Sequence, residues 1–282
     1  MTKELLAFVN DEYIPASGAS LLVNDLAIQR GYGIFDFCKT LHHTPIFLDE
    51  HIQRFVHSAG RLRLPIRPRQ EIITLIKELI DRNNIPHSGI KLILTGGYSP
   101  DGYTITKPNL VITQTPLQPP AMDTFEKGIR LVTYPHIRQM PDIKTIDYLM
   151  AIWLQPYIRE KNADDVLYHL DGLMSECPRS NFFIVTKEDT VVTPSENILK
   201  GVIRGKVLDL AQQVAGTEER PVSWEDIRNA REAFITSTTK HIVPVWQIDG
   251  RTVGDGRPGK VSRHLRTQLD DLVSASVTLH KT

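Results

Sequence analysis

Residues 33–62 read GIFDFCKTLHHTPIFLDEHIQRFVHSAGRL, and this stretch combines a β-strand pattern with a helical one. Two apolar runs are joined by a short polar turn at His42 and His43, which is typical of a β-hairpin. From Asp49 on, apolar residues recur every three or four positions, as they do on one face of a helix. These residues are Ile52, Phe55, Ala59 and Leu62. The stretch therefore predicts two strands followed by a helix, a mixture that favours an α/β fold.

The rest of the chain repeats this mixture on both sides of a proline-rich segment. Residues 115–123 read TPLQPPAMD, a composition typical of a linker. Further strands are expected before this segment in LLAFVN, SLLVND, GIKLILTGG and NLVITQT. After it, strands are expected in IRLVTYP, VLYHLDGLMSE, NFFIVTKEDTVVTP, AFITST and PVWQIDG. Helices are expected over about 70–83, 148–161, 206–215, 224–232 and from 260 to the end.

These patterns predict two mixed α/β (α+β) domains, which suits a chain of 282 residues. We expect residues 1–115 to form a small N-terminal domain and residues 116–123 to form an interdomain linker. Residues 124–282 are expected to form a large C-terminal domain.

The composition excludes several classes of protein. Lys and Arg number 33, as do Asp and Glu, so the formal net charge is zero and nothing suggests a nucleic-acid partner. No apolar run approaches the ~18 residues that span a membrane. Cys38 and Cys177 are too few for a disulfide framework, and the N-terminal residues MTKELLAFVNDEY lack an apolar signal core. We therefore expect a cytoplasmic protein that binds neither nucleic acid nor membrane.

Lys144 lies among apolar neighbours in MPDIKTIDYLMAIW. One interpretation is a lysine whose stem packs on the core while its ammonium group reaches water. The other is a Schiff-base lysine, since burial favours the neutral amine that attacks a carbonyl carbon. The sequence around Lys144 fits both.

Glu176, in DGLMSECPRSNFF, is either a solvated turn residue or a carboxylate that faces a positively charged ring nitrogen. Three further segments could hold a phosphate. Gly201 precedes a helix in ILKGVIRGKV, where backbone N–H groups form an anion site. FITSTT offers hydroxyl groups, and Arg54 in LDEHIQRF offers a charged donor. Each of these segments also has an ordinary structural interpretation.

Two other patterns predict no chemistry. His42 and His43 have no third ligand at a useful spacing, so no metal site is expected. Ser180 has no histidine and aspartate that would complete a catalytic triad.

The order of these motifs resembles the class IV aminotransferases, which are the fold-type IV pyridoxal phosphate enzymes. The lysine in DIK is followed by the glutamate before SNFF, a glycine–apolar–apolar–arginine loop and STT. The family includes D-amino acid and branched-chain aminotransferases and aminodeoxychorismate lyase. The resemblance runs from RGYGIFDF and DEHIQRF to FITSTT and covers nearly the whole chain. It implies pyridoxal 5'-phosphate as cofactor and a homodimer whose active sites, at the domain interface, are completed by the partner subunit.

The resemblance also implies roles for individual residues. Lys144 would form the Schiff base with the cofactor and move the proton, and Glu176 would hold the pyridine nitrogen. Arg54 would bind the cofactor phosphate together with the backbone of Val202 and Ile203 and with Thr238 and Thr239. Tyr148 matches, with a gap of one residue, a tyrosine on the phenolic oxygen of the cofactor.

Two positions depart from the pattern of the family. The phosphate loop, usually glycine–isoleucine–threonine, is Gly201–Val202–Ile203 here, so a hydroxyl is lost while the amide remains. The residue after the glutamate, usually glycine, is Cys177, so the turn is expected to differ.

The substrate pocket differs from that of other D-amino acid enzymes in the family. Their carboxylate-binding arginine and histidine are missing from TGGYSPDGYT, and Phe35 stands where they carry a tyrosine. Arg30, from the neighbouring subunit, and Lys91 take positions of pocket residues of branched-chain enzymes and are candidates to bind a carboxylate. The alternative is that they pair with Asp101 or Asp36 and only stabilise the dimer.

A cationic pocket suits a carboxylate better than an aliphatic side chain. We therefore expect a D-amino acid transaminase, acting on substrates such as D-alanine or D-glutamate, with 2-oxoglutarate as acceptor in a ping-pong cycle through pyridoxamine phosphate. The alternatives are a branched-chain L-amino acid aminotransferase and, less favoured, a lyase of the aminodeoxychorismate type. The sequence gives no role to Arg179.

Overall fold

A computed structural model describes residues 4–118, 124–214 and 216–279. Contacts along the backbone divide the chain into two compact units, each described by itself below. Unit 1 comprises Met1–Gln118, Ile143–Asp147 and Ala275–Thr282, and unit 2 comprises Pro119–Asp142 and Tyr148–Ser274. The linker predicted at residues 116–123 falls largely on residues 119–123, which lie outside the described part.

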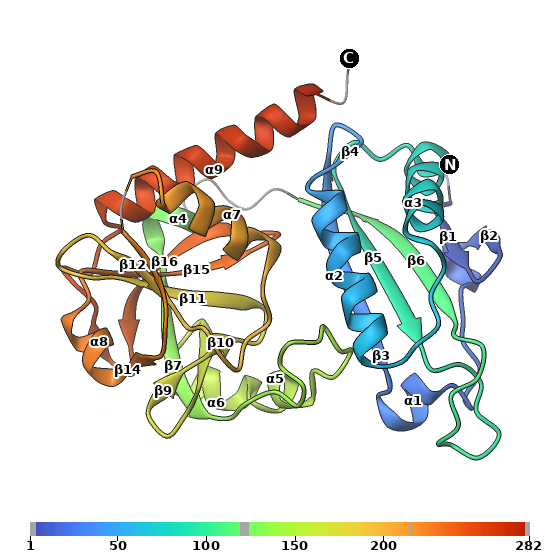
Figure 1. Ribbon diagram of the computed structural model, residues 1–282, viewed down its shortest axis with the longest axis horizontal. Coiled ribbons are helices and arrows are strands. Elements are labelled where there is room, and N and C mark those ends of the chain that lie inside the picture. Colours follow the sequence, from blue (N-terminus) through green and yellow to red (C-terminus); the bar gives the residue numbers. More distant parts are fainter. Residues whose placement is uncertain (1–3, 119–123, 215, 280–282) are drawn as a thin grey trace. The chain divides into compact units, whose positions relative to one another are not determined.

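Unit 1 is built on a six-stranded sheet with the order β2-β1-β6-β5-β3-β4 (Figure 1). Its strands are β1 (Leu6–Val9), β2 (Glu12–Pro15), β3 (Gly33–Leu41), β4 (Thr44–Pro45), β5 (Ser88–Thr95) and β6 (Leu110–Pro116). Its helices are the 3-10 turn η1 (Ala16–Gly18), α1 (Leu26–Arg30), α2 (Leu48–Arg61) and α3 (Arg69–Asn83). The hairpin between β3 and β4 turns at His42 and His43, whose φ angles of 49° and 66° are both positive, as a two-residue type I′ turn requires.

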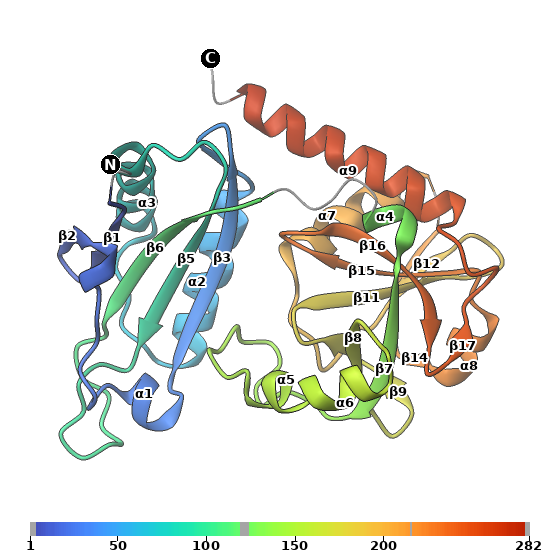
Figure 2. The ribbon, with the colours of Figure 1, turned by 180° about the vertical axis from the view of Figure 1, so that it is seen from behind.

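The core of unit 1 lies between its sheet and the helices α2 and α3. Alternate residues of β3, including Ile34 and Cys38, face the helices, and the apolar stripe of α2 meets them with Ile52 and Phe55. Figure 2 shows the opposite face of the sheet, in front of α2. Lys91 of β5 is exposed, whereas its neighbours along the strand are buried on the helix side.

Residues 143–147 extend the strand pairing of unit 1 beside β3. The Phe35 N–H donates to the carbonyl oxygen of Lys144 at 2.9 Å, and the Ile146 N–H donates to the carbonyl oxygen of Gly33 at 3.1 Å. A β-bridge joins Ile34 to Thr145, and Ile143 is part of the buried core. A segment that the sequence analysis assigned to the C-terminal domain therefore groups with unit 1.

Unit 2 contains an eleven-stranded sheet with the main order β13-β12-β11-β15-β16-β7-β8-β9-β14, to which β10 and β17 attach. Its strands are β7 (Ile129–Pro135), β8 (Asp165–Leu170), β9 (Leu173–Met174), β10 (Glu176–Cys177), β11 (Ser180–Val185), β12 (Val191–Thr193), β13 (Thr217–Glu219), β14 (Val222–Ser223), β15 (Glu232–Ser237), β16 (His241–Ile248) and β17 (Arg251–Thr252). Its helices are α4 (Thr124–Lys127), α5 (Leu149–Trp153), α6 (Gln155–Glu160), α7 (Val202–Ala211), α8 (Trp224–Asn229) and most of α9 (Lys260–Leu279).

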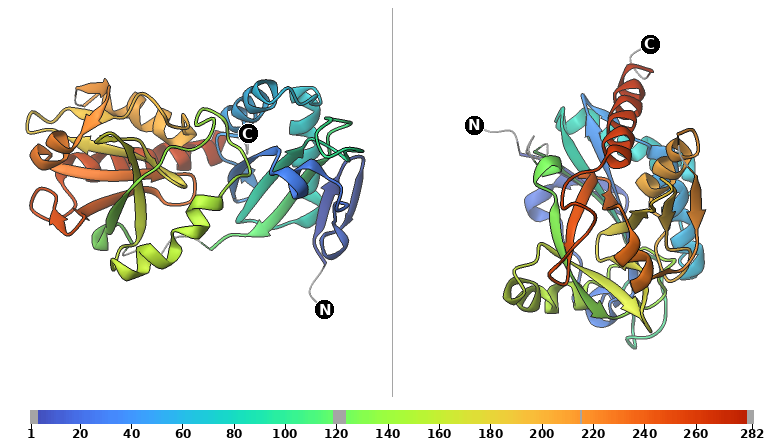
Figure 3. Two further views of the ribbon diagram at one scale, coloured as in Figure 1. Left: turned by 90° about the horizontal axis from the view of Figure 1, so that it is seen from below. Right: turned by 90° about the vertical axis from the view of Figure 1, so that its left-hand side faces the viewer.

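Buried polar contacts fix α9 against this sheet, and Figure 3 shows this long helix in red. The Glu232 carboxylate accepts hydrogen bonds from the N–H groups of Val261 and Ser262, which have no partner inside the helix. Arg266 donates to the carbonyl oxygens of Lys240 and Ile242 next to it. The start of α9 therefore depends on a carboxylate at the first residue of β15.

The helix periodicity was a good guide to α2, α3 and α9 and a poorer one elsewhere. The helix expected over 148–161 is two short helices, α5 and α6, interrupted at Leu154, and a proline stands in the first turn of α6. α7 begins at Val202 rather than at residue 206, and α8 ends at Asn229 because Glu232 already belongs to β15. The short helices α1 and α4 were not predicted.

Within residues 4–118, 124–214 and 216–279, no helix combines the length and the apolarity that crossing a bilayer requires. In the same residues, no group of three or more His, Cys, Asp or Glu side chains is arranged to hold a metal ion.

Candidate active site

Lys144 lies beside the aromatic ring of Phe35 in unit 1. Its Nζ is 4.5 Å from the ring centroid, and the Nζ of Lys91 lies 5.5 Å from the same centroid. The Lys144 N–H donates to the Oγ of Ser58 on α2 at 3.3 Å, and the Lys144 carbonyl accepts from Phe35. The backbone of this lysine is thus held on both sides, while its half-buried side chain contacts the ring through a cation–π interaction.

Asp36 points to the other face of β3, because successive side chains of a strand alternate. Arg54 donates to both of its carboxylate oxygens, from Nε at 2.8 Å and from Nη2 at 2.8 Å. The Nδ1 of His51 lies 2.8 Å from Oδ1. Burial acts to raise the pKa of Asp36, but the Arg54 charge and the hydrogen bonds from Arg54 and His51 outweigh it and hold that pKa well below its ordinary value.

Arg30 is exposed at the end of α1, and its guanidinium lies 5.1 Å from the ring centroid of Tyr103. Asp101, one of its proposed partners, is engaged within its own turn. Its oxygens accept from the Thr104 N–H at 2.7 Å, the Tyr103 N–H at 2.9 Å, and the hydroxyls of Thr104 and Ser99. These hydrogen bonds, that of the Thr104 N–H first, lower the pKa of Asp101.

The alternative in which Arg30 or Lys91 pairs with Asp36 or Asp101 is therefore not observed. Asp36 is paired with Arg54, and Asp101 is paired with its own turn. Among the described residues, neither Arg30 nor Lys91 forms an ion pair with a carboxylate.

Glu176 is a buried carboxylate of unit 2, with 4% of its surface exposed. Its Oε1 accepts from the Nε of Arg138 at 2.8 Å. Its Oε2 accepts from the Leu199 N–H at 3.0 Å and from the Nδ2 of Asn181 at 3.3 Å. An arginine and two amide donors suit a negatively charged acceptor.

The loop before α7 packs closely against this carboxylate. Asn181 also donates to the Leu199 carbonyl at 2.7 Å, and a Cβ on Gly201 would lie 2.2 Å from the Oδ1 of Asn181. Only glycine therefore fits at this position without displacing Asn181. Gly201 caps α7 without a side-chain hydrogen bond, so the N–H groups of Val202 and Ile203 point out of the first turn, as in an anion site.

The remaining predicted residues of unit 2 lie outside its strands and helices. Thr238 and Thr239 are half-buried in the turn from β15 to β16. Asn181, which donates to Glu176, pairs with Thr236 of β15. Thr238 follows Thr236 by two residues, so the turn lies just beyond this pair. Tyr148 is half-buried and precedes the first residue of α5. Glu176, the α7 start and the threonine turn thus belong to one end of the β10–β11–β15 strands.

Cys177, which stands after Glu176 where the family usually has glycine, is part of the hydrophobic core of unit 2. Its side chain is buried, and burial raises the pKa of its thiol well above its ordinary value. The thiol therefore stays protonated and packs as a small apolar group. Arg179, two residues on, is exposed.

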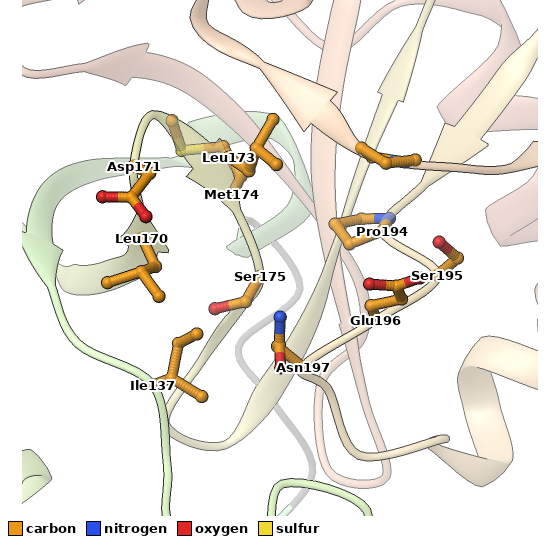
Figure 4. Close-up of a pocket in the computed structure, with 11 residues that line it drawn as sticks. Ile137, Leu170, Asp171, Leu173, Met174, Ser175, Pro194, Ser195, Glu196 and Asn197 are labelled. Atoms are coloured by element: carbon orange, nitrogen blue, oxygen red, sulfur yellow. The ribbon is translucent and has the colours of Figure 1, made fainter.

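A cavity of about 130 Å³ lies in unit 2 beside the hairpin of β8 and β9. Figure 4 shows it between this hairpin, with Leu170 and Leu173, and the loop that carries Asn197. Ser175, which precedes Glu176, also lines it. None of the predicted site residues lines this cavity.

Four residues that form hydrogen bonds with the predicted site residues were not predicted from the sequence: His51, Ser58, Arg138 and Asn181. A signal existed for His51, because it lies one helical turn before Arg54 and both face β3. Asp36 itself was a signal, since a charged residue within the apolar run GIFDFC needs a partner. Asn181 faces Glu176 across the antiparallel pair of β10 and β11, five residues away, whereas Arg138 reaches Glu176 only through tertiary folding.

A comparison with known protein families shows to which family the chain belongs. A family model described as amino-transferase class IV matches residues 33–248. The chain belongs to the class IV aminotransferases. This confirms the family and the mixed α/β fold expected from the sequence. The family depends on pyridoxal 5'-phosphate, which is the cofactor that the sequence predicted.

Individual relatives of this class IV aminotransferase cover almost its whole length. It is 30% identical over 273 residues to a D-alanine aminotransferase of Bacillus licheniformis, covering 94% of this chain and 95% of the relative. It is 28% identical to a D-alanine aminotransferase of Staphylococcus haemolyticus, covering 98% and 99%. A solved branched-chain amino acid aminotransferase of Escherichia coli has a TM-score of 0.86 over 96% of this chain and 95% of that one. At 23% identity, the latter similarity concerns the fold.

Proposed function

We propose that this class IV aminotransferase transfers the amino group of D-amino acids, such as D-alanine or D-glutamate, to 2-oxoglutarate in a ping-pong cycle. The observation that carries the proposal is the pair of cations Arg30 and Lys91, neither of which is paired with a carboxylate of the described residues. Two such cations suit the carboxylate of an amino acid. The D-alanine aminotransferases that align along 94% and 98% of the chain support the choice of D-substrates.

Each unit, taken by itself, carries groups suited to a part of pyridoxal 5'-phosphate. Arg54, the N–H groups of Val202 and Ile203, and the hydroxyls of Thr238 and Thr239 are suited to a phosphate. Glu176 is suited to a protonated ring nitrogen, and Tyr148 to the phenolic oxygen. When bound, the cofactor supplies an electron sink for the bond to the substrate Cα.

Lys144 is the residue to which we assign the proton transfer. Its Nζ would take the proton from the substrate Cα and deliver it to the cofactor carbon that receives the amino group, and the second half of the cycle would run this transfer in reverse onto the acceptor. The ring of Phe35 and the bonds to its backbone restrict the positions that the amine can take. Lys91, beside the same ring, is placed to attract the substrate carboxylate toward this amine.

We further propose a homodimer in which Arg30 serves the active site of the partner subunit. Exposed apolar residues support an interface in each unit. In unit 1, Val23 and Tyr103 are each 80% exposed, and their loops are joined by a bond from the Ser99 N–H to the Asn24 carbonyl. In unit 2, α5 buries none of its residues and exposes Leu149, Ile152 and Trp153. A cytoplasmic location is also proposed, because Cys38 and Cys177 are both free thiols.

The substrate assignment is tested by a half-reaction without an amino acceptor. The holoenzyme is mixed with D-alanine or D-glutamate, and in parallel with L-leucine or L-glutamate, and the 2-oxo acid released per active site is measured. We expect about one equivalent from the D-substrates alone, as a ping-pong cycle requires. Release from the L-substrates alone would transfer the assignment to the branched-chain alternative. Arg30→Ala and Lys91→Ala are expected to raise KM for D-substrates, and unchanged KM in both would remove the carboxylate argument.

The shared site is tested by complementation between an inactive variant, Lys144→Ala, and a variant with weakened substrate binding, Arg30→Ala, assayed at a low concentration of D-substrate. Arg30→Ala and Lys144→Ala subunits are co-expressed with different tags, and the mixed dimers are isolated. If Arg30 acts across the dimer, one site of each mixed dimer combines an intact Lys144 with an intact Arg30, and activity returns. If Arg30 acts within its own subunit, both sites stay defective.

A further inference from the structure

The carboxylate of Asp36 is enclosed by hydrogen-bond donors beneath β3. Besides the two bonds from Arg54 and the contact with His51, it accepts the N–H of Phe37 at 2.7 Å. The Asp36 side chain is 0% exposed and that of Arg54 is 11% exposed. A buried charge with this set of partners does not contact solvent, so its role has to be sought in what it does to Arg54.

His51 is the less expected member of this cluster. Its ring is buried, and its Nδ1 lies 2.8 Å from the Oδ1 of Asp36, a distance that requires a proton on Nδ1. Its Nε2 is buried and has no hydrogen-bond partner among the residues that the structure describes. Burial lowers the pKa of His51 below 6.5, so the ring is neutral and Nε2 carries no proton. A buried, unsatisfied nitrogen is a cost that the bond from Nδ1 to Asp36 offsets.

The orientation of Arg54 follows from these contacts. Its Nε and Nη2 are both directed at Asp36, in the two-pronged geometry that fixes the plane of a guanidinium. Its Nη1 donates no hydrogen bond within residues 4–118, 124–214 and 216–279. One edge of the guanidinium is therefore bound and the other edge is left for a ligand.

We propose that Asp36 and His51 are positioning residues that hold the Arg54 guanidinium so that its Nη1 edge meets the phosphate of the cofactor. This inference rests on the phosphate role proposed for Arg54. Asp36 fixes the guanidinium plane, and neutral His51 holds the carboxylate without adding a charge that would compete for it. Without them, the long Arg54 side chain has to be ordered each time the phosphate binds.

The test compares the affinities for pyridoxal 5'-phosphate and for pyridoxal, which lacks the phosphate. Both dissociation constants are measured by equilibrium dialysis on the full chain freed of cofactor, and their ratio isolates the phosphate contact. Asp36→Asn is expected to reduce the preference for the phosphorylated form by about 10-fold or more, as the loss of a charged hydrogen bond does. The constant for pyridoxal should stay nearly unchanged.

His51 offers a matched pair of variants that does not disturb the ion pair directly. In His51→Asn, the amide nitrogen occupies the place of Nδ1 and keeps a donor for Asp36, so the preference should be retained. His51→Leu keeps the bulk and removes the donor, so the preference should fall about 3-fold to 10-fold, less than in Asp36→Asn because Arg54 keeps its own two bonds to the carboxylate. A purely structural role would weaken both ligands equally.

The outcomes separate this inference from the proposal that it rests on. Arg54→Gln is measured alongside and should abolish most of the preference for the phosphorylated form. If Arg54→Gln abolishes the preference while Asp36→Asn and His51→Leu leave it intact, the positioning role is wrong and the phosphate role of Arg54 stands. If Arg54→Gln leaves the preference intact, the phosphate role itself is wrong. Equal losses for both ligands in Asp36→Asn and His51→Leu also overturn the positioning role.

Discussion

Asp36 in unit 1 and Glu176 in unit 2 are both buried carboxylates, but their surroundings are built differently. The donors to Asp36 lie on one helix and on its own strand: Arg54, His51 and Phe37. The donors to Glu176 come from three separate segments: Arg138 after β7, Asn181 on the neighbouring strand β11, and Leu199 in the loop before α7. The side-chain donors to Asp36 share one helix, whereas those around Glu176 are brought together from a loop, a neighbouring strand and the loop before α7.

This difference separates two uses of a buried acid. Asp36 is bound to Arg54, which in the proposed function meets the cofactor phosphate, so its proposed effect is to orient that cation. Glu176 connects three segments and, in the proposed function, meets the ring nitrogen itself. Changes at Asp36 should therefore affect cofactor affinity, whereas changes at Glu176 should affect the chemical step.

Replacing each acid by its amide is the strongest test of this comparison. Glu176→Gln keeps the shape and removes the charge, and we expect kcat to fall about 10²- to 10³-fold, as when one electrostatic stabiliser of a transition state is lost. Asp36→Asn should keep kcat close to wild type at saturating cofactor. Steady-state kinetics at several cofactor concentrations measures both effects. If both variants lose kcat to the same degree, the two acids do not have separate roles.

A second prediction concerns the close packing of Gly201 against Asn181. Gly201→Ala places a methyl group at the Oδ1 of Asn181 and should reduce the free energy of unfolding by about 1–3 kcal/mol, as overpacking does. In the Asn181→Ala background, the same change should cost clearly less, because the clashing oxygen is gone. Denaturant unfolding of the two single variants and the double variant measures the coupling. Additive losses would mean that Gly201 is required for another reason.

A third prediction follows from the buried, neutral ring of His51. Its pKa in the folded state lies below the 6.5 of the unfolded chain, so the unfolded chain takes up a proton first as the pH falls. The contribution of neutral His51 to the free energy of unfolding is therefore fully present above about pH 6.5. It declines at lower pH, by at most about 1.4 kcal/mol per pH unit. In His51→Asn no group at this position takes up a proton. The free energy of unfolding should therefore depend less steeply on pH between pH 6.5 and 5. The free energy of unfolding in urea, measured at each pH, gives both slopes, and equal slopes would contradict a neutral His51.

The smallest effect is expected at the other end of β3, away from Asp36. His43 lies in the left-handed region with φ at 66°, where side chains are strained and glycine is not. His43→Gly should raise the free energy of unfolding by about 0.5–1 kcal/mol. Cofactor affinity should not change, which makes this variant a control for effects transmitted along β3. A change in thermal midpoint measures the gain, and a loss would show that the His43 side chain has a stabilising contact.

The sequence predicted those parts of the fold that depend on local pattern. α2, α3 and α9 were found because their apolar residues keep a helical period over several turns. The interruption at Leu154 was missed, because apolar residues continue through it and the break depends on the proline that follows. The start of α7 was placed too late, since Val202 and Ile203 look equally suited to a strand.

The same distinction holds for the candidate site. The family resemblance indicated Lys144, Glu176 and Arg54, while their supports were not predicted. The bond from the Lys144 N–H to Ser58 and the bond from Asn181 to Glu176 join residues 86 and 5 positions apart, and no periodicity marks them. Burial decides such contacts, because a polar group that leaves water needs a partner wherever the fold provides one.

The strand-like segment 143–147 has a consequence for how this protein can be made. During translation, residues 1–118 emerge first, but the edge of β3 is covered only when residues 143–147 arrive from within the stretch that otherwise builds unit 2. The end of α9, from Ala275, also groups with unit 1, so unit 1 contains both the first and the last described parts of the chain. A gene cut at residue 118 would encode two incomplete pieces, and Lys144 reaches its place beside β3 only in a nascent chain that has grown well past residue 118.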